Sequence, residues 1–181
     1  MTTRLDTFNN SWYQPGSKLK ITLWYVCNAL FLRCSLQPFS FVKIFFLRLF
    51  GAKIGEGVVI KPSINVKYPW KLTIGNYVWI GENVWIDNLD EVVIGNHVCI
   101  SQGALLLCGN HNYKKSTFDL LIGKIILEDG VWIGAQAVVC GGITCASHSM
   151  LSVSSVTAKN LEAYSIYRGN PAEKVGARTI S

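Results

Sequence analysis

The sequence predicts a mainly β protein, a parallel β-solenoid preceded by a helical segment. Three observations predict this fold. From Gly51 onward, aliphatic residues recur every six positions in successive runs, and a small residue usually follows each of them. The first fifty residues lack this period and contain two apolar runs of helical length. A period of six fits neither the 3.6-residue period of a helix nor the alternation of a plain strand, and it is typical of a short strand followed by a turn.

The first element is a basic, aromatic-rich segment over residues 1–50. It holds six basic residues against Asp6 alone, whereas the rest of the chain has eleven basic and ten acidic residues. Its apolar runs, 21–32 and 39–50, are expected to be helical, and the first is too short to cross a bilayer, which needs about 20 apolar residues. Two interpretations stay open. The helices pack on the main domain or a neighbouring subunit, or they lie in the interface of an anionic membrane.

The second element, residues 51–160, is the predicted solenoid, and residues 161–181 are expected to form a C-terminal tail. The aliphatic residues should point inward, three six-residue units should close one triangular coil, and the small residues should allow tight corners. The predicted inward positions are Ile54, Ile60, Val66, Ile74, Ile80, Ile86, Ile94, Ile100, Leu106, Leu127, Ile133, Val139, Cys145, Leu151 and Thr157.

The repeat breaks open at one corner. Coil 94–111 has the expected eighteen residues and places His111 at its last corner, but a polar excursion over 112–124 follows before the pattern resumes. The preceding coil carries a two-residue insertion within 87–91. Because successive coils stack in register, this insertion should lie near the same corner, about 4.8 Å below.

Polar side chains should therefore gather at that corner. Imidazole is the side chain best suited to accept a proton at neutral pH, which makes His111 a candidate general base. Asp87 and Asn88 would bind a ligand or orient His111; alternatively, they satisfy the turn that the insertion makes. The excursion carries Tyr113 and is long enough for a binding loop, or else it is a surface loop. His97 and His148 fall at ordinary turn positions and are expected to be structural.

The amino-acid composition indicates which kind of protein this is and where it is located. Half of the residues are hydrophobic and 15% are charged, which excludes a disordered chain. Six cysteines form no CxxC pair, so we expect free, mostly buried thiols in a reducing cytoplasm and no metal site. A polar stretch through Lys20 precedes the first apolar run, unlike a signal peptide. The expected location is the cytoplasm, at the inner face of the membrane if the N-terminal segment binds lipid. No nucleic-acid partner is expected.

Four stretches carry a family resemblance: "IGENVWI", "VVIGNHVCIS", "GVWIGAQAVV" and "GNPAEKV". They resemble the hexapeptide-repeat acyltransferases, and most nearly the colanic-acid and exopolysaccharide O-acetyltransferases related to the galactoside and maltose O-acetyltransferases. The similarity runs from about Asn9 to Val175. It implies a left-handed parallel β-helix, acetyl-CoA as co-substrate without a metal, and a homotrimer with active sites between subunits. In this family the excursion that carries Tyr113 reaches across the trimer interface, and polar residues near Asp87 and Asn88 bind the acceptor.

The resemblance also implies roles for individual residues. His111 would deprotonate a sugar hydroxyl that attacks acetyl-CoA directly, without an acyl-enzyme. Gly134 and Ala135 match positions whose backbone faces the thioester arm. The stretch 152–160, with Val153, Ala158 and Lys159, resembles the Gly-rich strip along the pantetheine, from which it departs at Ser152, Ser154, Ala158 and Asn160. Lys159, Arg168 and Lys174 would pair with the CoA phosphates or be solvated surface charges.

Three functions follow as hypotheses. The leading one is an acetyl-CoA-dependent O-acetyltransferase acting on a sugar hydroxyl of a cell-surface polysaccharide or its lipid-linked precursor. The second is an N-acyltransferase acting on an amino sugar of a nucleotide sugar, and the third is a non-catalytic solenoid that serves as an assembly or binding module. A γ-class carbonic anhydrase is excluded, because the three histidines lie 14 and 37 residues apart and none are closely spaced. The tryptophans at 79, 85 and 132 should face outward, which favours a trimer.

Overall fold

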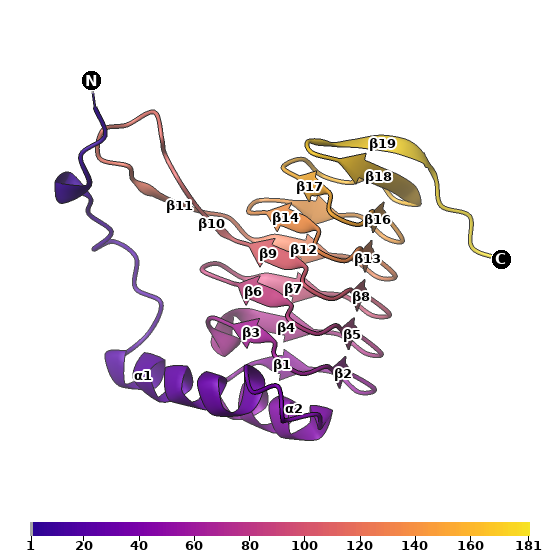
Figure 1. Cartoon of the computed structure of the whole chain (residues 1–181), viewed down its shortest axis with the longest axis horizontal. Coiled ribbons are helices and arrows are strands. Elements are labelled where there is room, and N and C mark those ends of the chain that lie inside the picture. The colour runs from indigo at the N-terminus through magenta and orange to yellow at the C-terminus, as the bar shows by residue number, and fades with distance from the viewer. Residues whose placement is uncertain (1) are drawn as a thin grey trace.

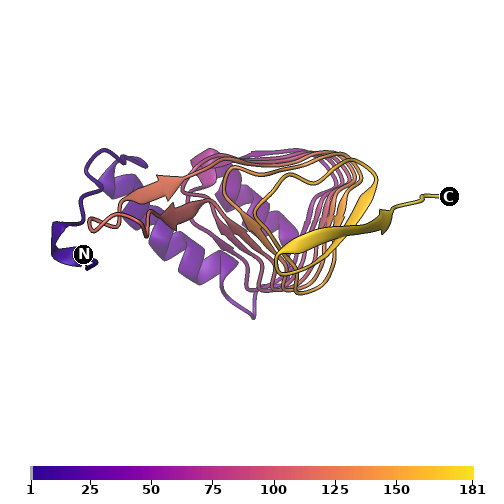
Figure 2. The same cartoon turned by 90° about the horizontal axis from the view of Figure 1, so that it is seen from above.

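The computed structural model describes residues 2–181 and confirms a left-handed parallel β-helix with N-terminal helices. Stacked coils form the body of the molecule, and the helices lie across the end of the first coil (Figure 1). A two-stranded hairpin projects from one corner of the triangular coils (Figure 2). The predicted six-residue period therefore corresponds to a real solenoid with a single large opening.

Three sheets form the sides of the prism, and their strands are parallel except for the final pair. The first sheet contains β1 (Lys53–Ile54), β4 (Leu72–Ile74), β7 (Val92–Ile94), β12 (Ile125–Leu127) and β15 (Thr144–Cys145). The second contains β2 (Val59–Ile60), β5 (Trp79–Ile80), β8 (Cys99–Ile100), β13 (Trp132–Ile133), β16 (Met150–Leu151), β18 (Ser165–Gly169) and β19 (Ala172–Ala177). The third contains β3 (Asn65–Val66), β6 (Trp85–Asp87), β9 (Leu105–Leu107), β14 (Val138–Cys140) and β17 (Val156–Thr157).

The core consists of three stacked columns of the predicted inward residues. On the third sheet, for example, Ile86 pairs with Leu106, and Leu106 pairs with Val139. All three are fully buried. The small residues are needed at the corners: a Cβ on Gly75 would lie 2.7 Å from the carbonyl carbon of Gly95 in the next coil. Coil stacking thus demands both the aliphatic columns and the glycine corners.

The N-terminal segment begins with a short helical turn η1 (Leu5–Thr7) and continues into helices that cap the first coil. These helices are α1 (Lys18–Cys27), the π-helical turn η2 (Asn28–Leu32) and α2 (Ser40–Leu49). The indole Nε1–H of Trp24 donates to the carbonyl of Val66 at 2.8 Å, and the amide of Asn28 donates to the side chain of Asn65 at 2.7 Å. The Ser40 hydroxyl accepts from the N–H of Ile60 at 3.0 Å. These contacts satisfy backbone and side-chain groups that the end of the sheet leaves unpaired.

The C-terminal residues differ from the expected tail. Strand β18 adds to the second sheet beside β16, where Leu151 pairs with Tyr167, and β19 then pairs with β18. Tyr167 is buried and continues an inward column with an aromatic side chain. The aliphatic pattern therefore misses this strand, although it closes the other end of the solenoid.

Candidate functional site

The solenoid opens at the corner between β9 and β12. Cys108 is the last residue in coil register, since its N–H donates to the Asp87 carbonyl at 3.2 Å and its carbonyl accepts from Gly123 at 2.9 Å. Between them the chain forms an antiparallel hairpin of β10 (Gly109–His111) and β11 (Leu120–Ile122). The excursion thus begins at Gly109, three residues earlier than expected, and His111 lies on the projecting strand instead of at the coil corner.

The imidazole of His111 is fixed from within the hairpin. Its Nδ1 lies 2.9 Å from the carbonyl oxygen of Phe118, and the two rings stack with centroids 4.3 Å apart. A carbonyl oxygen only accepts hydrogen bonds, so Nδ1 carries the proton in the neutral ring and Nε2 presents its lone pair. Nε2 has no hydrogen-bond partner among residues 2–181. This is the tautomer that a general base at Nε2 requires.

The two polar residues of the insertion are engaged elsewhere. Lys67 Nζ lies 2.9 Å from Asp87 Oδ1, so the two form an ion pair, although the angle between them does not suit a hydrogen bond. Asn88 is fully buried; its Oδ1 accepts from the N–H of Tyr68 at 2.9 Å and its Nδ2 donates to the Tyr68 carbonyl at 2.6 Å. Asn88 therefore satisfies the backbone of the widened coils, and the partner that orients His111 is the Phe118 carbonyl.

The hairpin tip carries the third acceptor-side candidate. Tyr113 is 76% exposed. The tip itself is ordered by Asp119, which accepts from Thr117 at 2.6 Å and pairs with Lys115 at 2.9 Å. Tyr113 is thus available to a ligand or a second chain but makes no aromatic contact among the described residues.

The predicted donor-side residues divide between two corners. Gly134, Ala135 and Val153 share the corner that joins the second and third sheets, where a Cβ on Gly134 would lie 2.6 Å from the Val153 nitrogen. The N–H of Gly134 is already used, since it donates to the Leu151 carbonyl at 2.7 Å. The N–H of Ala135 has no partner among residues 2–181 and could therefore stabilise an oxyanion.

Ala158 lies at the other corner, above the hairpin. With Cys140, Gly141 and Gly142 it lines a cavity of about 290 Å³ at the foot of β10 and β11. The two glycines place no side chains in this cavity wall, and Gly142 has open space where a side chain would be. In one chain, therefore, Ala158 is close to the hairpin that carries His111, whereas the column of Gly134 and Ala135 is not.

The three C-terminal cations are all exposed. Lys159 pairs with Glu173 at 2.8 Å and Lys174 pairs with Glu162 at 2.7 Å, both on the surface, where such pairs contribute little to stability. Arg168 forms no salt bridge within residues 2–181. Of the three residues predicted to bind the CoA phosphates, Arg168 is therefore the one that would not have to leave a carboxylate partner first.

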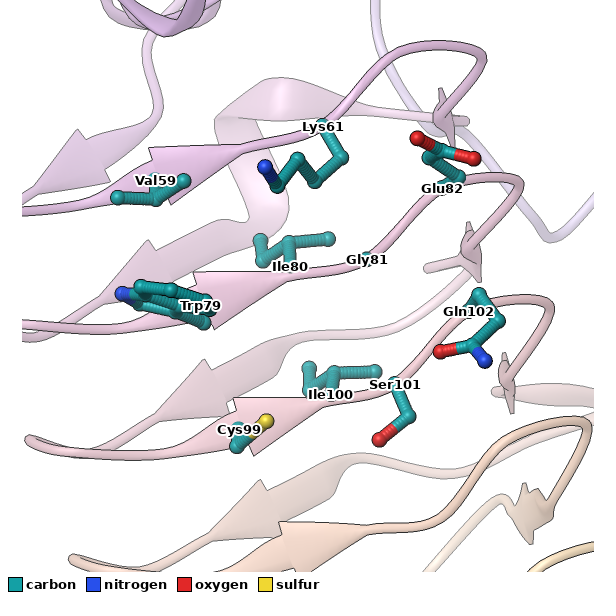
Figure 3. Close-up of a pocket in the computed structure, with 10 residues that line it drawn as sticks. All are labelled: Val59, Lys61, Trp79, Ile80, Gly81, Glu82, Cys99, Ile100, Ser101 and Gln102. Atoms are coloured by element: carbon teal, nitrogen blue, oxygen red, sulfur yellow. The ribbon is translucent and has the colours of Figure 1, made fainter.

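A second cavity lies on the opposite side of the solenoid from the hairpin. It has a volume of about 390 Å³ and opens on the outer face of β2, β5 and β8, between Lys61, Trp79 and Gln102 (Figure 3). The tryptophans point outward as predicted, and Trp132 Nε1 donates to the Ser101 hydroxyl at 3.0 Å. This face is apolar enough to contact another chain.

The remaining titratable residues offer no alternative chemistry at the hairpin. Burial raises the pKa of the Cys108 thiol to about 12, so it is not a thiolate nucleophile near neutral pH. His97 and His148 adopt positive φ angles at coil corners and stack on Tyr77 and Tyr164, which places them in turns as expected. Within the described chain, no three ligand-type side chains gather where a metal ion would fit.

The aromatic residues around His111 were not predicted from the sequence. Phe118 provides both a carbonyl and a stacked ring, and Phe8 from the N-terminal segment contacts the imidazole with ring centroids 5.6 Å apart. A signal for Phe118 was its place inside the excursion. No periodicity marks Phe8.

Comparisons with known proteins identify relatives of this chain. No family model matches the chain. It is 36% identical over 166 residues to the putative colanic acid biosynthesis acetyltransferase WcaF of Escherichia coli, which covers 92% of this chain and 91% of that protein.

Two solved structures share the fold. The hexapeptide-repeat acetyltransferase VCA0836 of Vibrio cholerae, solved with acetyl-CoA, superposes with a TM-score of 0.73 at 20% identity over 81% of each chain. The N-acyltransferase AntD of Bacillus cereus, solved with dTDP-4-amino-4,6-dideoxyglucose and coenzyme A, has a TM-score of 0.64 at 18% identity over 76% of this chain and 90% of its own. By its identity to WcaF over nearly its full length, the chain belongs to the hexapeptide-repeat acetyltransferase family.

Proposed function

We propose that this protein transfers the acetyl group of acetyl-CoA to a sugar hydroxyl of a cell-surface polysaccharide or its lipid-linked precursor, with His111 as the general base. The observation that carries the proposal is the Nδ1 contact to Phe118, which leaves the Nε2 lone pair free on the projecting hairpin. The family membership and the WcaF name support the substrate class.

The proposed chemistry is a direct transfer in a ternary complex. As the hydroxyl oxygen bonds to the thioester carbon, its proton passes to Nε2 of His111. The tetrahedral intermediate then collapses, the carbon–sulfur bond breaks, and the CoA thiolate takes the proton from the imidazolium. The free N–H of Ala135 would stabilise the oxyanion when supplied by a neighbouring subunit.

The first test removes the base. His111→Ala should lower turnover by about 10²–10⁴-fold, which is the usual contribution of a positioned base. The protein should stay folded, because His111 lies on a hairpin that projects from the solenoid. The measurement is transfer of labelled acetyl to a panel of soluble and lipid-linked sugars. Turnover like the wild type in a folded variant would remove His111 from the mechanism.

An N-acyltransferase remains the second candidate, because the AntD fold is shared and His111 would serve either nucleophile. The labelled product of the same assay distinguishes them. An acetyl ester on a sugar oxygen supports the leading proposal, and an amide on an amino sugar supports the alternative.

For the donor, we propose that CoA lies between two subunits, along Gly134, Ala135 and Val153 of one and beside Ala158 of the other, and reaches toward the C-terminal cations. Lys159 and Lys174 would exchange their glutamate partners for phosphate, while Arg168 is already free to bind it. Val153 is exposed at this corner and would contact the apolar arm.

Arg168→Ala should therefore raise the KM for acetyl-CoA by about three- to tenfold, because one charge-assisted contact is lost, and should leave kcat unchanged. Steady-state kinetics measure both constants. Lys53→Ala, at an exposed cation on the first coil, is the control. An unchanged KM in Arg168→Ala would contradict this placement of the phosphates.

We also propose a homotrimer whose sites lie between subunits. One chain separates the donor corner of Ala135 from the hairpin of His111, so a complete site requires a second copy. The exposed Trp79, Trp85 and Trp132 support a subunit contact on the solenoid sides.

Light scattering should then give three times the chain mass of 20.1 kDa. A monomer that retains full activity would contradict a shared site.

Finally, we propose that the helical cap binds an anionic membrane, which would bring the site to a lipid-linked acceptor. No helix among residues 2–181 is long and apolar enough to cross a membrane, so the contact would be peripheral. Each helix has an inner apolar side, with Trp24 and Leu47 buried on the coil, and a second apolar stripe that faces away. The outer stripes are 52–70% exposed and consist of Leu19, Leu23, Val26 and Leu30 on α1 and η2, and of Phe41, Phe45 and Leu49 on α2.

The charges around these stripes match anionic headgroups. No acidic residue occurs between Asp6 and Glu56, and exposed basic side chains at Lys18, Arg33 and Arg48 flank the helices. Lys43 is the exception, since it is buried and burial lowers its pKa. An outward apolar face with a basic fringe is typical of interfacial helices.

Wild-type protein should co-sediment with phosphatidylglycerol vesicles and less with phosphatidylcholine. The double variant Leu23→Glu, Phe45→Glu should bind about 100-fold more weakly, because each large apolar side chain contributes about 1.5 kcal/mol or more. Ile180→Glu at the other end of the chain is the control. Equal sedimentation of the double variant, or none by the wild type, would contradict membrane binding.

A further inference from the structure

A strap of residues 4–17, which includes the helical turn η1, joins the hairpin to the cap. It starts at the hairpin tip, runs down the side of the solenoid and enters α1 (Figure 1). Of its residues, Phe8, Tyr13 and Pro15 are half-buried and the others are exposed. Ordering an extended segment costs about 1–2 kcal/mol per residue, so these anchors must offset a substantial loss of entropy.

The upper end of the strap contacts the hairpin at two points. The N–H of Arg4 donates to the Ser116 carbonyl at 2.8 Å, and the ring of Phe8 contacts the imidazole of His111. Leu5 is 67% exposed although it is equally apolar. The strap therefore packs the half-buried Phe8 against His111 and leaves a neighbouring apolar side chain in solvent.

The lower end is fastened to the inserted coils beneath the hairpin. The Tyr13 hydroxyl donates to the Leu89 carbonyl at 2.5 Å, and Lys71 Nζ lies 4.9 Å from the Tyr13 ring centroid. Burial raises the pKa of Tyr13, so the hydroxyl remains a donor. Farther along, Trp70 Nε1 donates to the Pro15 carbonyl at 2.6 Å.

Leu89 links these contacts back to the hairpin, since its side chain packs against Gly109. The insertion, the hairpin foot and the strap thus form one connected set of contacts. This connection gives the two-residue insertion a mechanical role.

The hairpin needs such support. Strands β10 and β11 share three residue pairs, and neither pairs with another strand. A two-stranded hairpin alone is marginally stable in water, and an error of about 1 Å in placing a catalytic group can cost on the order of 10²-fold in rate.

We infer that the strap is a positioning element for the catalytic hairpin and that Phe8 is its positioning residue, which together with Phe118 fixes the orientation of the His111 ring. The inference rests on the proposed role of His111. Phe8 acts through the imidazole and need not touch the acetyl donor.

The test compares Phe8→Ala with Phe8→Tyr, which keeps the ring, and with Leu5→Ala as the control from the same strap. Histidine labelled with ¹³C in the intact protein gives three imidazole signals, and His111→Gln assigns the relevant one. Phe8→Ala should shift the His111 signal alone and lower kcat about tenfold, with the KM for acetyl-CoA unchanged. Phe8→Tyr should restore both values, and Leu5→Ala should change neither.

An unshifted His111 signal in Phe8→Ala would overturn the inference, as would a shifted signal with wild-type kcat. If the wild type transfers no acetyl group to any sugar, the proposed function fails, and the signals still decide whether Phe8 holds the ring. A shift restored by Phe8→Tyr then supports the positioning contact.

Discussion

The parallel ladder between coils is the interaction on which the rest of the structure depends. Every regular coil must give its N–H and carbonyl groups to the coils above and below, with its aliphatic side chains stacked inside. Such a ladder tolerates irregular chain only where that chain leaves the prism at a corner. The hairpin does so after Cys108 and returns at Gly123, where one hydrogen bond closes the gap. The candidate base can thus project into solvent without interrupting the core.

Chemistry and packing are separated accordingly. The polar groups that keep the coils together already have hydrogen-bond partners. Asn88 bonds to the backbone of Tyr68, and the N–H of Gly134 donates to the Leu151 carbonyl. The groups with an unused hydrogen-bonding position lie at different corners: Nε2 of His111 is on the projecting hairpin, and the N–H of Ala135 is at a coil corner. This separation is the physical reason for proposing a site shared between subunits. The cap at one end adds an apolar outer face that a closed solenoid does not need for its own stability.

Much of this architecture could be predicted from sequence because the columns repeat. Ile86 above Val66 and below Leu106 follows from counting alone, and the structure confirms that register. Elements without a repeat could not be predicted. The hairpin pairs only three residues, Tyr167 continues a column with an aromatic ring, and the strap follows no period. His111 was found because the repeat breaks beside it, whereas its partners Phe8 and Phe118 are defined only by tertiary contact.

The central claim is a base-assisted transfer that passes the acetyl group directly from thioester to sugar. It is tested most directly by incubating the wild-type protein with labelled acetyl-CoA, quenching before and after acceptor is added, and separating protein from sugar. Direct transfer predicts that the protein carries no covalent label at either time. It also predicts that the label appears on the sugar once the sugar has been added. Acetyl bound covalently to the chain before the acceptor arrives, and then lost to the sugar, would contradict it.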